Sequence, residues 1–309
     1  MKILIYGAGV IGSIFAYKLK VGGNDITLLA RGKRLEQLKK NGLVLRDDII
    51  HKEVKEDINV IDRLNPDDEY DVALVIMQRQ QVDEILPILK NCKKISTIIF
   101  MGNNVSGANE YLQNIDKSRI LLGFGGPGGY KENHIVVVAY LDKAILYVGE
   151  LDGRISKRVL DIEKVFTNSG IKVEINENID AWLKSHVTFI IPLAMASYAA
   201  RKNNKKLFED DGLLDLSIIA LRENLNAIKE LGIPILPKKL KMLNYYPKSL
   251  FKRKIQKLLN SEFGRIALSG HADAAQAEML RLTDDFMDLV KNVKTNLSAN
   301  KKLYELSFA

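Results

Sequence analysis

The sequence predicts an α/β domain over residues 1–176, followed by an all-helical domain over residues 177–309. Three observations lead to this division. In the first part, short apolar runs typical of buried parallel strands alternate with segments of helical spacing. From residue 180 onward the signals are helical, and the composition changes at residues 176–180. The length of 309 residues is enough for two domains with a sizeable core.

The start of the chain carries the strongest single signal. The apolar run at residues 2–6 is followed at once by Gly7-Ala8-Gly9-Val10-Ile11-Gly12, then by helical spacing up to residue 21. Residues 25–29 are predicted to form a second strand. In this order of strand, turn, helix and strand, the pattern G-x-G-x-x-G indicates a Rossmann-type dinucleotide site.

Each glycine of the motif has an expected role. Gly7 would permit the tight turn, Gly9 would let the backbone approach a pyrophosphate, and Gly12 would let helix and strand pack closely. The N-terminus of the helix that follows the turn, with helical spacing at residues 13–21, would offer N–H groups and a positive dipole end to the phosphates. The alternative is a purely structural glycine turn.

The end of the second strand distinguishes the two nicotinamide cofactors. An NAD site usually has an acidic residue there, which binds the ribose 2′-hydroxyl. Residues 28–34 instead read Leu-Leu-Ala-Arg-Gly-Lys-Arg, with three cations and no acid. This suits a 2′-phosphate, so we expect NADP(H), with Arg31 as the main ligand and Lys33 or Arg34 in support. A solvated basic loop is the alternative.

The remaining elements of the first domain follow from periodicity and turn signals. We expect helices at residues 34–40, 81–89, 109–114 and 156–168, a hairpin or short strands at 43–60, and strands at 70–77, 95–101, 120–123, 135–139, 144–148 and 171–175. The runs at 135–139 and 144–148 alternate like antiparallel strands. The glycine-rich residues 123–129 lack the Lys-Ser/Thr of a P-loop, so we expect a connection there, with a phosphate cradle as the alternative.

The second domain is predicted from long helical segments at residues 180–201, 213–231 and 263–293, the first containing Pro192 and the last interrupted near 269–270. Much of the net charge of +8 lies in residues 238–257. A solvated helical surface explains this stretch without a partner. A nucleic-acid or membrane patch is the alternative, but no recognition motif accompanies it, and we expect neither partner.

The composition excludes several classes of protein. With one cysteine, Cys92, and four scattered histidines, the sequence shows no metal-ligand spacing, and we expect no metal. No apolar run approaches the roughly 20 residues that span a bilayer. The start does not read as a signal peptide, so we expect a cytoplasmic protein. The sequence leaves the oligomeric state open and allows a homodimer.

Lys184 is the first candidate for catalysis. It lies among Trp182, Leu183 and Val187 at the start of the second domain, an unusually apolar setting for a lysine. Partial burial makes a lysine a better acid near neutral pH, which suits a proton donor to a substrate carbonyl. A snorkelling lysine at a helix start explains the same pattern.

The chain resembles the ketopantoate reductase family, in order and along its whole length. The matching segments are Gly7-Ala8-Gly9-Val10-Ile11-Gly12, Leu29-Ala30-Arg31-Gly32-Lys33-Arg34-Leu35, Gly42-Leu43, Asn103-Asn104, Val148-Gly149-Glu150-Leu151-Asp152-Gly153, Asp180-Ala181-Trp182-Leu183-Lys184, Arg222-Glu223 and Glu230-Leu231-Gly232-Ile233-Pro234. The resemblance implies a helical domain like the C-terminal domain of 6-phosphogluconate dehydrogenase. It also implies NADPH-dependent reduction of 2-dehydropantoate to (R)-pantoate, in pantothenate biosynthesis.

The resemblance implies roles for individual residues. Lys184 matches the lysine that protonates the carbonyl oxygen, and Glu278 matches the glutamate that holds the substrate hydroxyl, although a solvated helix glutamate is the alternative there. Asn103 or Asn104 matches the asparagine that contacts nicotinamide and substrate. The predicted cofactor contacts are Gly7, Gly9, Val10, Ile11, Gly12, Arg31, Arg34, Gln78, Asn103 and Asn104.

Two departures from the family pattern bear on the substrate. Gln78 stands where the family usually has a lysine, and Thr188 stands where it usually has an asparagine. Arg79 follows Gln78 but would face differently in an extended chain. His186 points away from Lys184 on a regular helix and reads as structural, with a pocket role open. These departures keep two alternatives open: a reductase of another 2-oxo acid, and an NADPH-binding regulator without catalysis.

Overall fold

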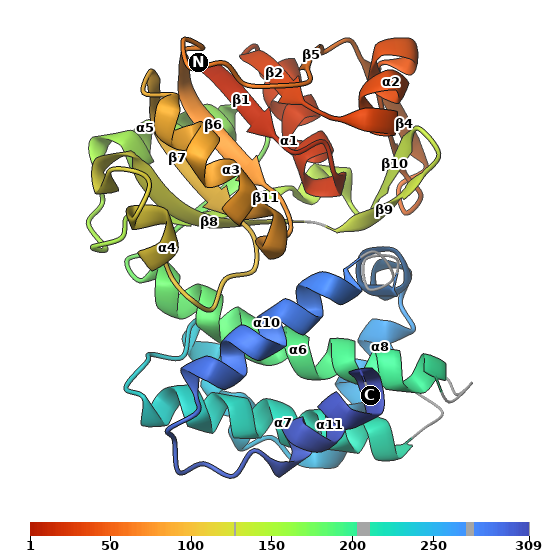
Figure 1. Cartoon of the computed structure of the whole chain (residues 1–309). Coiled ribbons are helices and arrows are strands. Elements are labelled where there is room, and N and C mark those ends of the chain that lie inside the picture. The colour runs from red at the N-terminus through yellow and green to blue at the C-terminus, as the bar shows by residue number, and fades with distance from the viewer. Residues whose placement is uncertain (127, 203–210, 270–274, 309) are drawn as a thin grey trace. The chain divides into compact units, whose positions relative to one another are not determined.

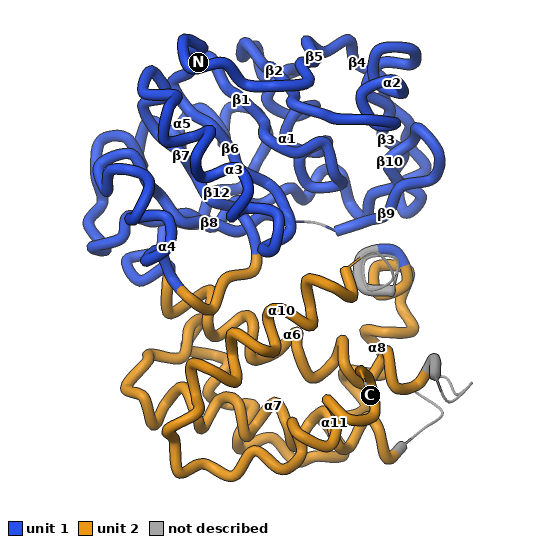
Figure 2. Tube along the Cα trace, viewed as in Figure 1, with its two compact units in different colours: residues 1–102, 107–179, 266–271 blue, residues 103–106, 180–265, 272–309 orange. Residues whose placement is uncertain are grey.

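The computed structural model describes residues 1–126, 128–202, 211–269 and 275–308 (Figure 1). The chain divides into two compact units (Figure 2). Unit 1 comprises residues 1–102, 107–179 and 266–271, and unit 2 comprises residues 103–106, 180–265 and 272–309. The change of unit at Ile179 lies three residues after the boundary expected at residue 176. Residues 103–106 group with unit 2 although they lie far from its other residues in sequence.

Unit 1 is built on an eight-stranded sheet with the order β12-β11-β8-β7-β6-β1-β2-β5. Its strands are β1 (Lys2–Tyr6), β2 (Asp25–Leu29), β5 (Asn59–Ile61), β6 (Tyr70–Ile76), β7 (Ile95–Met101), β8 (Ile120–Gly126), β11 (Ile145–Gly149) and β12 (Lys172–Ile175). The six strands from β5 to β8 are parallel to their neighbours, while β11 runs antiparallel to β8. This order confirms the predicted Rossmann-type α/β domain. The central strand β1 lies between β2 and β6, so their carboxyl ends meet at one edge.

A second, four-stranded sheet with the order β4-β3-β10-β9 completes unit 1. It comprises β3 (Leu43–Asp47), β4 (Lys52–Glu56), β9 (Gly129–Glu132) and β10 (Ile135–Val138), and β3 with β4 forms the expected hairpin. The helix α1 (Val10–Val21) contacts strands of both sheets. Its buried face is therefore shared between the two sheets, which explains why so many of its residues are apolar or small.

The other helices of unit 1 are α2 (Gly32–Asn41), α3 (Arg79–Asn91), α4 (Asn109–Leu112) and α5 (Lys157–Asn168). Alternate residues of the central strands point to opposite faces of the sheet. Ile3 and Ile5 join one core cluster with α1 and α5, where Phe15 and Phe166 meet with ring centroids 6.2 Å apart. Leu4, between them, is buried outside that cluster. Both faces of the sheet are thus covered, as expected for parallel strands.

One expectation for this unit needs correction. Gly123–Gly126 form the end of β8 rather than a connection. A Cβ atom at Gly123 would lie 2.8 Å from the Tyr147 carbonyl oxygen, and one at Gly125 would lie 2.7 Å from Met101 Cε. These two glycines therefore mark close packing within the sheet. The runs at 135–139 and 144–148 are strands with antiparallel neighbours, as expected: β10 pairs with β9 in the smaller sheet, and β11 pairs with β8 in the larger one.

Unit 2 is helical over the residues that the structure describes. Its helices are α6 (Ile179–Lys202), α7 (Asp211–Glu230), α8 (Lys248–Leu259), α10 (Gln276–Leu289) and α11 (Ser298–Phe308). The long helix expected at 263–293 is instead a short π-helical segment, Gly264–Ser269, followed by α10; residue 270, at the expected interruption, lies outside the described residues. A single apolar cluster, which includes Val105, forms the core. None of the helices described is long and apolar enough to cross a membrane.

Candidate active site

The glycine turn after β1 has three glycines in three different environments. Gly7 has φ +122°, and a Cβ atom there would lie 2.2 Å from the Ile76 carbonyl oxygen. A Cβ atom at Gly12 would lie 1.9 Å from the Gly7 carbonyl oxygen. At Gly9, by contrast, nothing lies within 4 Å of the Cβ position. The turn and its packing thus exclude side chains at Gly7 and Gly12, while Gly9 borders open space.

That open space lies at the start of α1. Gly9 is the N-cap residue of α1, and no side chain caps this end. The N–H groups of Val10, Ile11 and Gly12 have no acceptor within the helix because they belong to its first turn. These donors, the positive end of the helix dipole and the uncovered Gly9 backbone fit the pyrophosphate of a dinucleotide.

Arg31 lies two residues after the end of β2, the strand that pairs with β1 next to the glycine turn. It is exposed and forms the N-cap of α2. Its Nη2 donates a hydrogen bond to the hydroxyl of Tyr6 at 3.0 Å. Tyr6, the last residue of β1, is buried, and burial raises the pKa of its hydroxyl although the Arg31 charge opposes the shift. The phenol therefore stays neutral near pH 7.

Arg34 has a different set of partners. Its Nε donates to the Ala8 carbonyl at 3.2 Å, its Nη1 to the His134 carbonyl at 2.9 Å and its Nη2 to Ser13 Oγ at 3.2 Å. All three guanidinium nitrogens thus bind protein acceptors, and burial lowers the pKa of the group. Through Ala8 and Ser13, Arg34 stabilises the glycine turn. Its predicted contact with the cofactor stays a prediction. Lys33 is exposed.

Gln78 and Arg79 follow β6, the other neighbour of β1. Gln78 is the N-cap of α3, and its Oε1 accepts a hydrogen bond from Gln80 Nε2 at 2.7 Å. Arg79 is buried and forms ion pairs with Asp83, at 2.8 Å, and with Glu110. The Arg79 charge is therefore used within unit 1 and does not replace the family lysine. A neutral amide remains at position 78.

In unit 2, Asn103 and Glu278 come together. Asn103 Nδ2 donates a hydrogen bond to Glu278 Oε1 at 3.1 Å, and its Oδ1 is buried with no hydrogen-bond partner among the described residues. Glu278 lies in the first turn of α10 and is 4% exposed. Burial raises the pKa of Glu278, and the hydrogen bond from Asn103 opposes this shift only in part. A buried carboxyl group beside an unsatisfied amide oxygen is a candidate binding site for a polar ligand. Asn104 is buried in the same unit.

Lys184 lies on α6 with its side chain 12% exposed, and it forms an ion pair with Asp180 one turn earlier. The spacing of four residues places both on one helical face. Thr188, one turn later, is buried and donates from Oγ1 to the Ser185 carbonyl at 2.7 Å. Asn224 of α7 donates from Nδ2 to the Thr188 carbonyl at 3.4 Å. An asparagine therefore lies next to the position where the family usually has one, but it comes from another helix.

His186 faces an apolar pocket rather than the Lys184 side. Its ring stacks on Trp182, with centroids 5.3 Å apart, and burial lowers the pKa of His186 to about 4. The cavity measures about 140 Å³. Its lining consists of Trp182, His186, Phe189, Leu236, Pro237 and Leu240. At neutral pH this histidine is uncharged, as the apolar lining requires.

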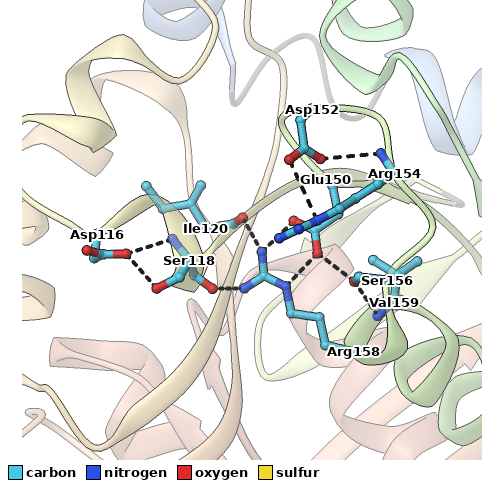
Figure 3. A network of polar contacts seen from close by, with 9 residues as sticks. All are labelled: Asp116, Ser118, Ile120, Glu150, Asp152, Arg154, Ser156, Arg158 and Val159. Carbon is cyan, nitrogen blue, oxygen red and sulfur yellow. Dashed lines mark hydrogen bonds and ion pairs between the residues drawn. The ribbon is translucent and has the colours of Figure 1, made fainter.

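Two of the motifs that match the family are structural. Glu150 directly follows β11 and accepts a hydrogen bond from Arg158 Nε of α5 (Figure 3). The two atoms lie 2.7 Å apart. Arg158 also donates to the carbonyls of Ser118 and Ile120, which links α5 to β8. In unit 2, Glu223 accepts from the backbone N–H groups at the start of α11. Both glutamates stabilise the fold and lie outside the candidate site.

Three residues that the sequence did not single out belong to the candidate site or its support. Asp180 could have been found from its spacing of four residues to Lys184. Tyr6 could have been found because it ends the strand next to Arg31. Asn224 left no signal in the sequence. Within the described part of the chain, no group of three or more His, Cys, Asp or Glu could hold a metal ion.

These features define a class of protein. A Rossmann-type unit has an open glycine turn that suits a dinucleotide, and a helical unit has a buried carboxyl group and a lysine. Together they are the parts of a nicotinamide-dependent oxidoreductase.

Comparisons with known proteins give the family. The model of ketopantoate reductase PanE/ApbA matches residues 3–153. A 2-dehydropantoate 2-reductase of Pyrococcus horikoshii is 23% identical over 238 residues, and one of Pyrococcus abyssi is 24% identical over 240 residues, each match covering 75% of both proteins. The first half of the chain matches the ketopantoate reductase family, and the protein is an oxidoreductase.

Solved structures confirm the fold. A PanE/ApbA family ketopantoate reductase from Ralstonia eutropha matches with a TM-score of 0.78 at 15% identity. A D-mandelate dehydrogenase in complex with NADH and anilino(oxo)acetate matches with a TM-score of 0.76 at 16% identity. Both matches cover 99% of this chain and 97% of the other.

Proposed function

We propose that this protein reduces a 2-oxo acid with NADPH, and that 2-dehydropantoate is the first substrate to test. The buried pair of Asn103 and Glu278 carries the proposal, because a desolvated carboxyl group beside an unsatisfied amide oxygen needs a polar ligand. The names of the Pyrococcus relatives support the choice of 2-dehydropantoate. The cations after β2, with Arg31 exposed at that strand end, support NADPH.

Lys184 would act as the general acid in this reaction. When bound, the nicotinamide cofactor supplies the hydride. Lys184 would donate a proton to the carbonyl oxygen of the substrate as that oxygen becomes a hydroxyl. Asp180 would hold the ammonium group in place through their ion pair.

Glu278 and Asn103 would orient the substrate. The Glu278 carboxyl group would accept a hydrogen bond from a substrate hydroxyl, and Asn103 Oδ1 would take a second donor of the substrate. In unit 1, the first turn of α1 and the Gly9 backbone would hold the pyrophosphate, and Arg31 the 2′-phosphate.

A second candidate substrate class is another 2-oxo acid. Gln78 is neutral where the family usually has a lysine, and Arg79 is occupied by Asp83 and Glu110, so no cation from this segment is available to a substrate. The Asn103–Glu278 pair would bind a substrate of either class. Gln78 is the residue that favours another 2-oxo acid, because it departs from the usual family pattern.

The test is an NADPH-oxidation assay with a panel of 2-oxo acids that includes 2-dehydropantoate, pyruvate, 2-oxoisovalerate and phenylglyoxylate. Selective turnover of 2-dehydropantoate supports the first assignment, and selective turnover of another acid supports the second. NADPH binding without turnover of any acid would overturn both and favour a regulator.

A further inference from the structure

The hydrogen bond between Tyr6 and Arg31 joins the two strands that border the glycine turn. Tyr6 ends β1 directly before Gly7, and in the sheet it is paired with Leu29, the last residue of β2. Arg31 lies two residues after Leu29. The Tyr6 ring is 1% exposed, so packing fixes the position of its hydroxyl, which Arg31 Nη2 approaches to 3.0 Å.

The two arginines of this segment are held very differently. Arg34 is half-buried and uses three nitrogens on protein acceptors. Arg31 is exposed, and the Tyr6 hydroxyl is the single partner of its guanidinium among the described residues. A guanidinium has five N–H donors, so one bond to Tyr6 leaves the others for a ligand. The hydrogen bond to Tyr6 thus orients the Arg31 guanidinium and leaves N–H donors for a ligand.

An exposed arginine without such a contact samples many rotamers, and fixing it on a ligand has an entropic cost. A partner that restricts the guanidinium beforehand lowers this cost. Tyr6 is suited to orienting Arg31 because its ring is held by the packing of the buried core. Its hydroxyl accepts the hydrogen bond from Arg31 without introducing a charge.

We propose that Tyr6 is a positioning residue for the cofactor: it orients Arg31 toward the ribose 2′-phosphate and so sets the preference for NADPH over NADH. The inference rests on the proposed function, since it takes Arg31 as the 2′-phosphate ligand. It goes beyond that function by assigning part of the selectivity to a buried side chain that does not itself touch the phosphate.

The test measures equilibrium binding, without turnover. NADPH and NADH are titrated into the full-length protein and its Tyr6→Phe variant, followed by nicotinamide fluorescence. Adenosine 2′,5′-bisphosphate and AMP serve as a second pair of probes, which differ in the 2′-phosphate alone. Loss of one orienting hydrogen bond should weaken NADPH and the bisphosphate by about 3- to 10-fold and leave NADH and AMP within about 2-fold.

Tyr70→Phe is the matched control. Tyr70 is also buried in the large sheet and hydrogen-bonded, to Thr27, but it starts β6 at the opposite end of the strands. Its loss should lower the melting temperature without changing the ratio of NADPH to NADH affinity. An equal change of that ratio in Tyr70→Phe and Tyr6→Phe would overturn the inference, because it would reflect general loosening of the sheet.

A double-mutant cycle with Arg31→Ala separates this inference from the proposed function. If Tyr6 acts through Arg31, adding Tyr6→Phe to Arg31→Ala should cause no further loss of NADPH selectivity. If Arg31→Ala abolishes the preference while Tyr6→Phe leaves it intact, the role of Tyr6 is wrong and the cofactor assignment stands. If the wild-type protein shows no preference for NADPH, the cofactor assignment itself fails.

Discussion

Asn103 Nδ2 donates to Glu278 Oε1 at 3.1 Å, although 175 residues separate the two in sequence. The contact joins the loop after β7 to the first turn of α10 and buries the carboxyl group of Glu278. Glu278 is therefore a buried carboxyl group whose partner comes from a distant part of the chain.

Replacing Glu278 with Gln should reduce oxo-acid turnover by about 10- to 1,000-fold, the range for a residue that positions the reacting group. NADPH binding should change less than turnover, because the substitution affects Asn103 but leaves the predicted dinucleotide contacts of unit 1 untouched. Steady-state kinetics and NADPH titration measure the two effects. Glu262→Gln, an exposed glutamate with 65% of its side chain accessible, is the control. Equal activity of the two variants would remove Glu278 from the site.

Glu278 also predicts a pH dependence of stability. Its pKa is raised in the folded protein above the ordinary value of 4.5, so the folded state binds more protons than the unfolded state between these two values. Wild-type stability should therefore match that of Glu278→Gln most closely below pH 4.5 and fall behind it as pH rises through the folded pKa. Urea unfolding at a series of pH values measures the difference. A difference that grows toward acid would contradict the burial effect.

Lys184→Ala should lower turnover by about 10²- to 10⁴-fold, the usual contribution of a general acid. The NADPH dissociation constant should stay within about 2-fold, because the predicted cofactor contacts lie elsewhere. Lys157→Ala is the control, since Lys157 forms the same type of ion pair, with Asp161 four residues later, but is 88% exposed. Unchanged turnover of Lys184→Ala would refute its catalytic role.

Gly9 and Gly12 should respond in opposite ways to substitution by alanine. At Gly12 a Cβ atom would meet the Gly7 carbonyl oxygen at 1.9 Å, so Gly12→Ala should lower the melting temperature markedly. At Gly9 nothing lies within 4 Å, so Gly9→Ala should keep wild-type stability but weaken dinucleotide binding at least about 10-fold by blocking the pyrophosphate. Calorimetry and NADPH titration measure both. Normal binding by Gly9→Ala would argue against a pyrophosphate at this turn.

Glu150→Gln should destabilise unit 1 by about 3 kcal/mol, because it leaves the Arg158 charge without its buried carboxylate. Burial alone would raise the pKa of Glu150, but hydrogen bonds from Arg158 and Ser156 outweigh it and lower the pKa. The stabilisation should therefore be present above the ordinary value of 4.5 and be lost as pH falls through the folded pKa. Asp152→Asn, in the more exposed pair with Arg154, should cost under about 0.5 kcal/mol. Similar losses in both variants, measured by denaturant unfolding, would contradict the role of burial.

The parallel strands could be predicted from the sequence because their signal is local. The expected bounds of β2 and β7 agree with the structure residue for residue, since each is a short, largely apolar segment between turn residues. The partners of β10 and β11 could not be predicted, because alternation shows that one face is buried but does not identify the neighbouring strand. The prediction of a connection at the glycines that end β8 was wrong for a similar reason. Their small size serves packing between segments far apart in sequence.

The candidate site divides in the same way. The glycine turn and Arg31 follow from a motif within one βαβ unit, so local sequence was sufficient to propose them. Lys184 could be proposed as a catalytic residue from its apolar neighbours, but Glu278 could be proposed only from the family resemblance. No periodicity could reveal its contact with Asn103. The partners of Arg34 could not be predicted either. Its position in the sequence suggested a cofactor ligand, but in the structure its guanidinium binds three protein acceptors.

The grouping of residues 103–106 with the helices has a consequence for how this chain can be divided. Val105 belongs to the apolar core of unit 2, and Asn103 supplies the amide for Glu278. A fragment that begins at residue 180 would lack both, with a gap in its core and a buried carboxyl group short of its amide partner. The helical half is therefore not an autonomous module that can be exchanged between relatives by a single crossover. Chimaeras should fold well when the loop 102–107 and the helices come from the same parent.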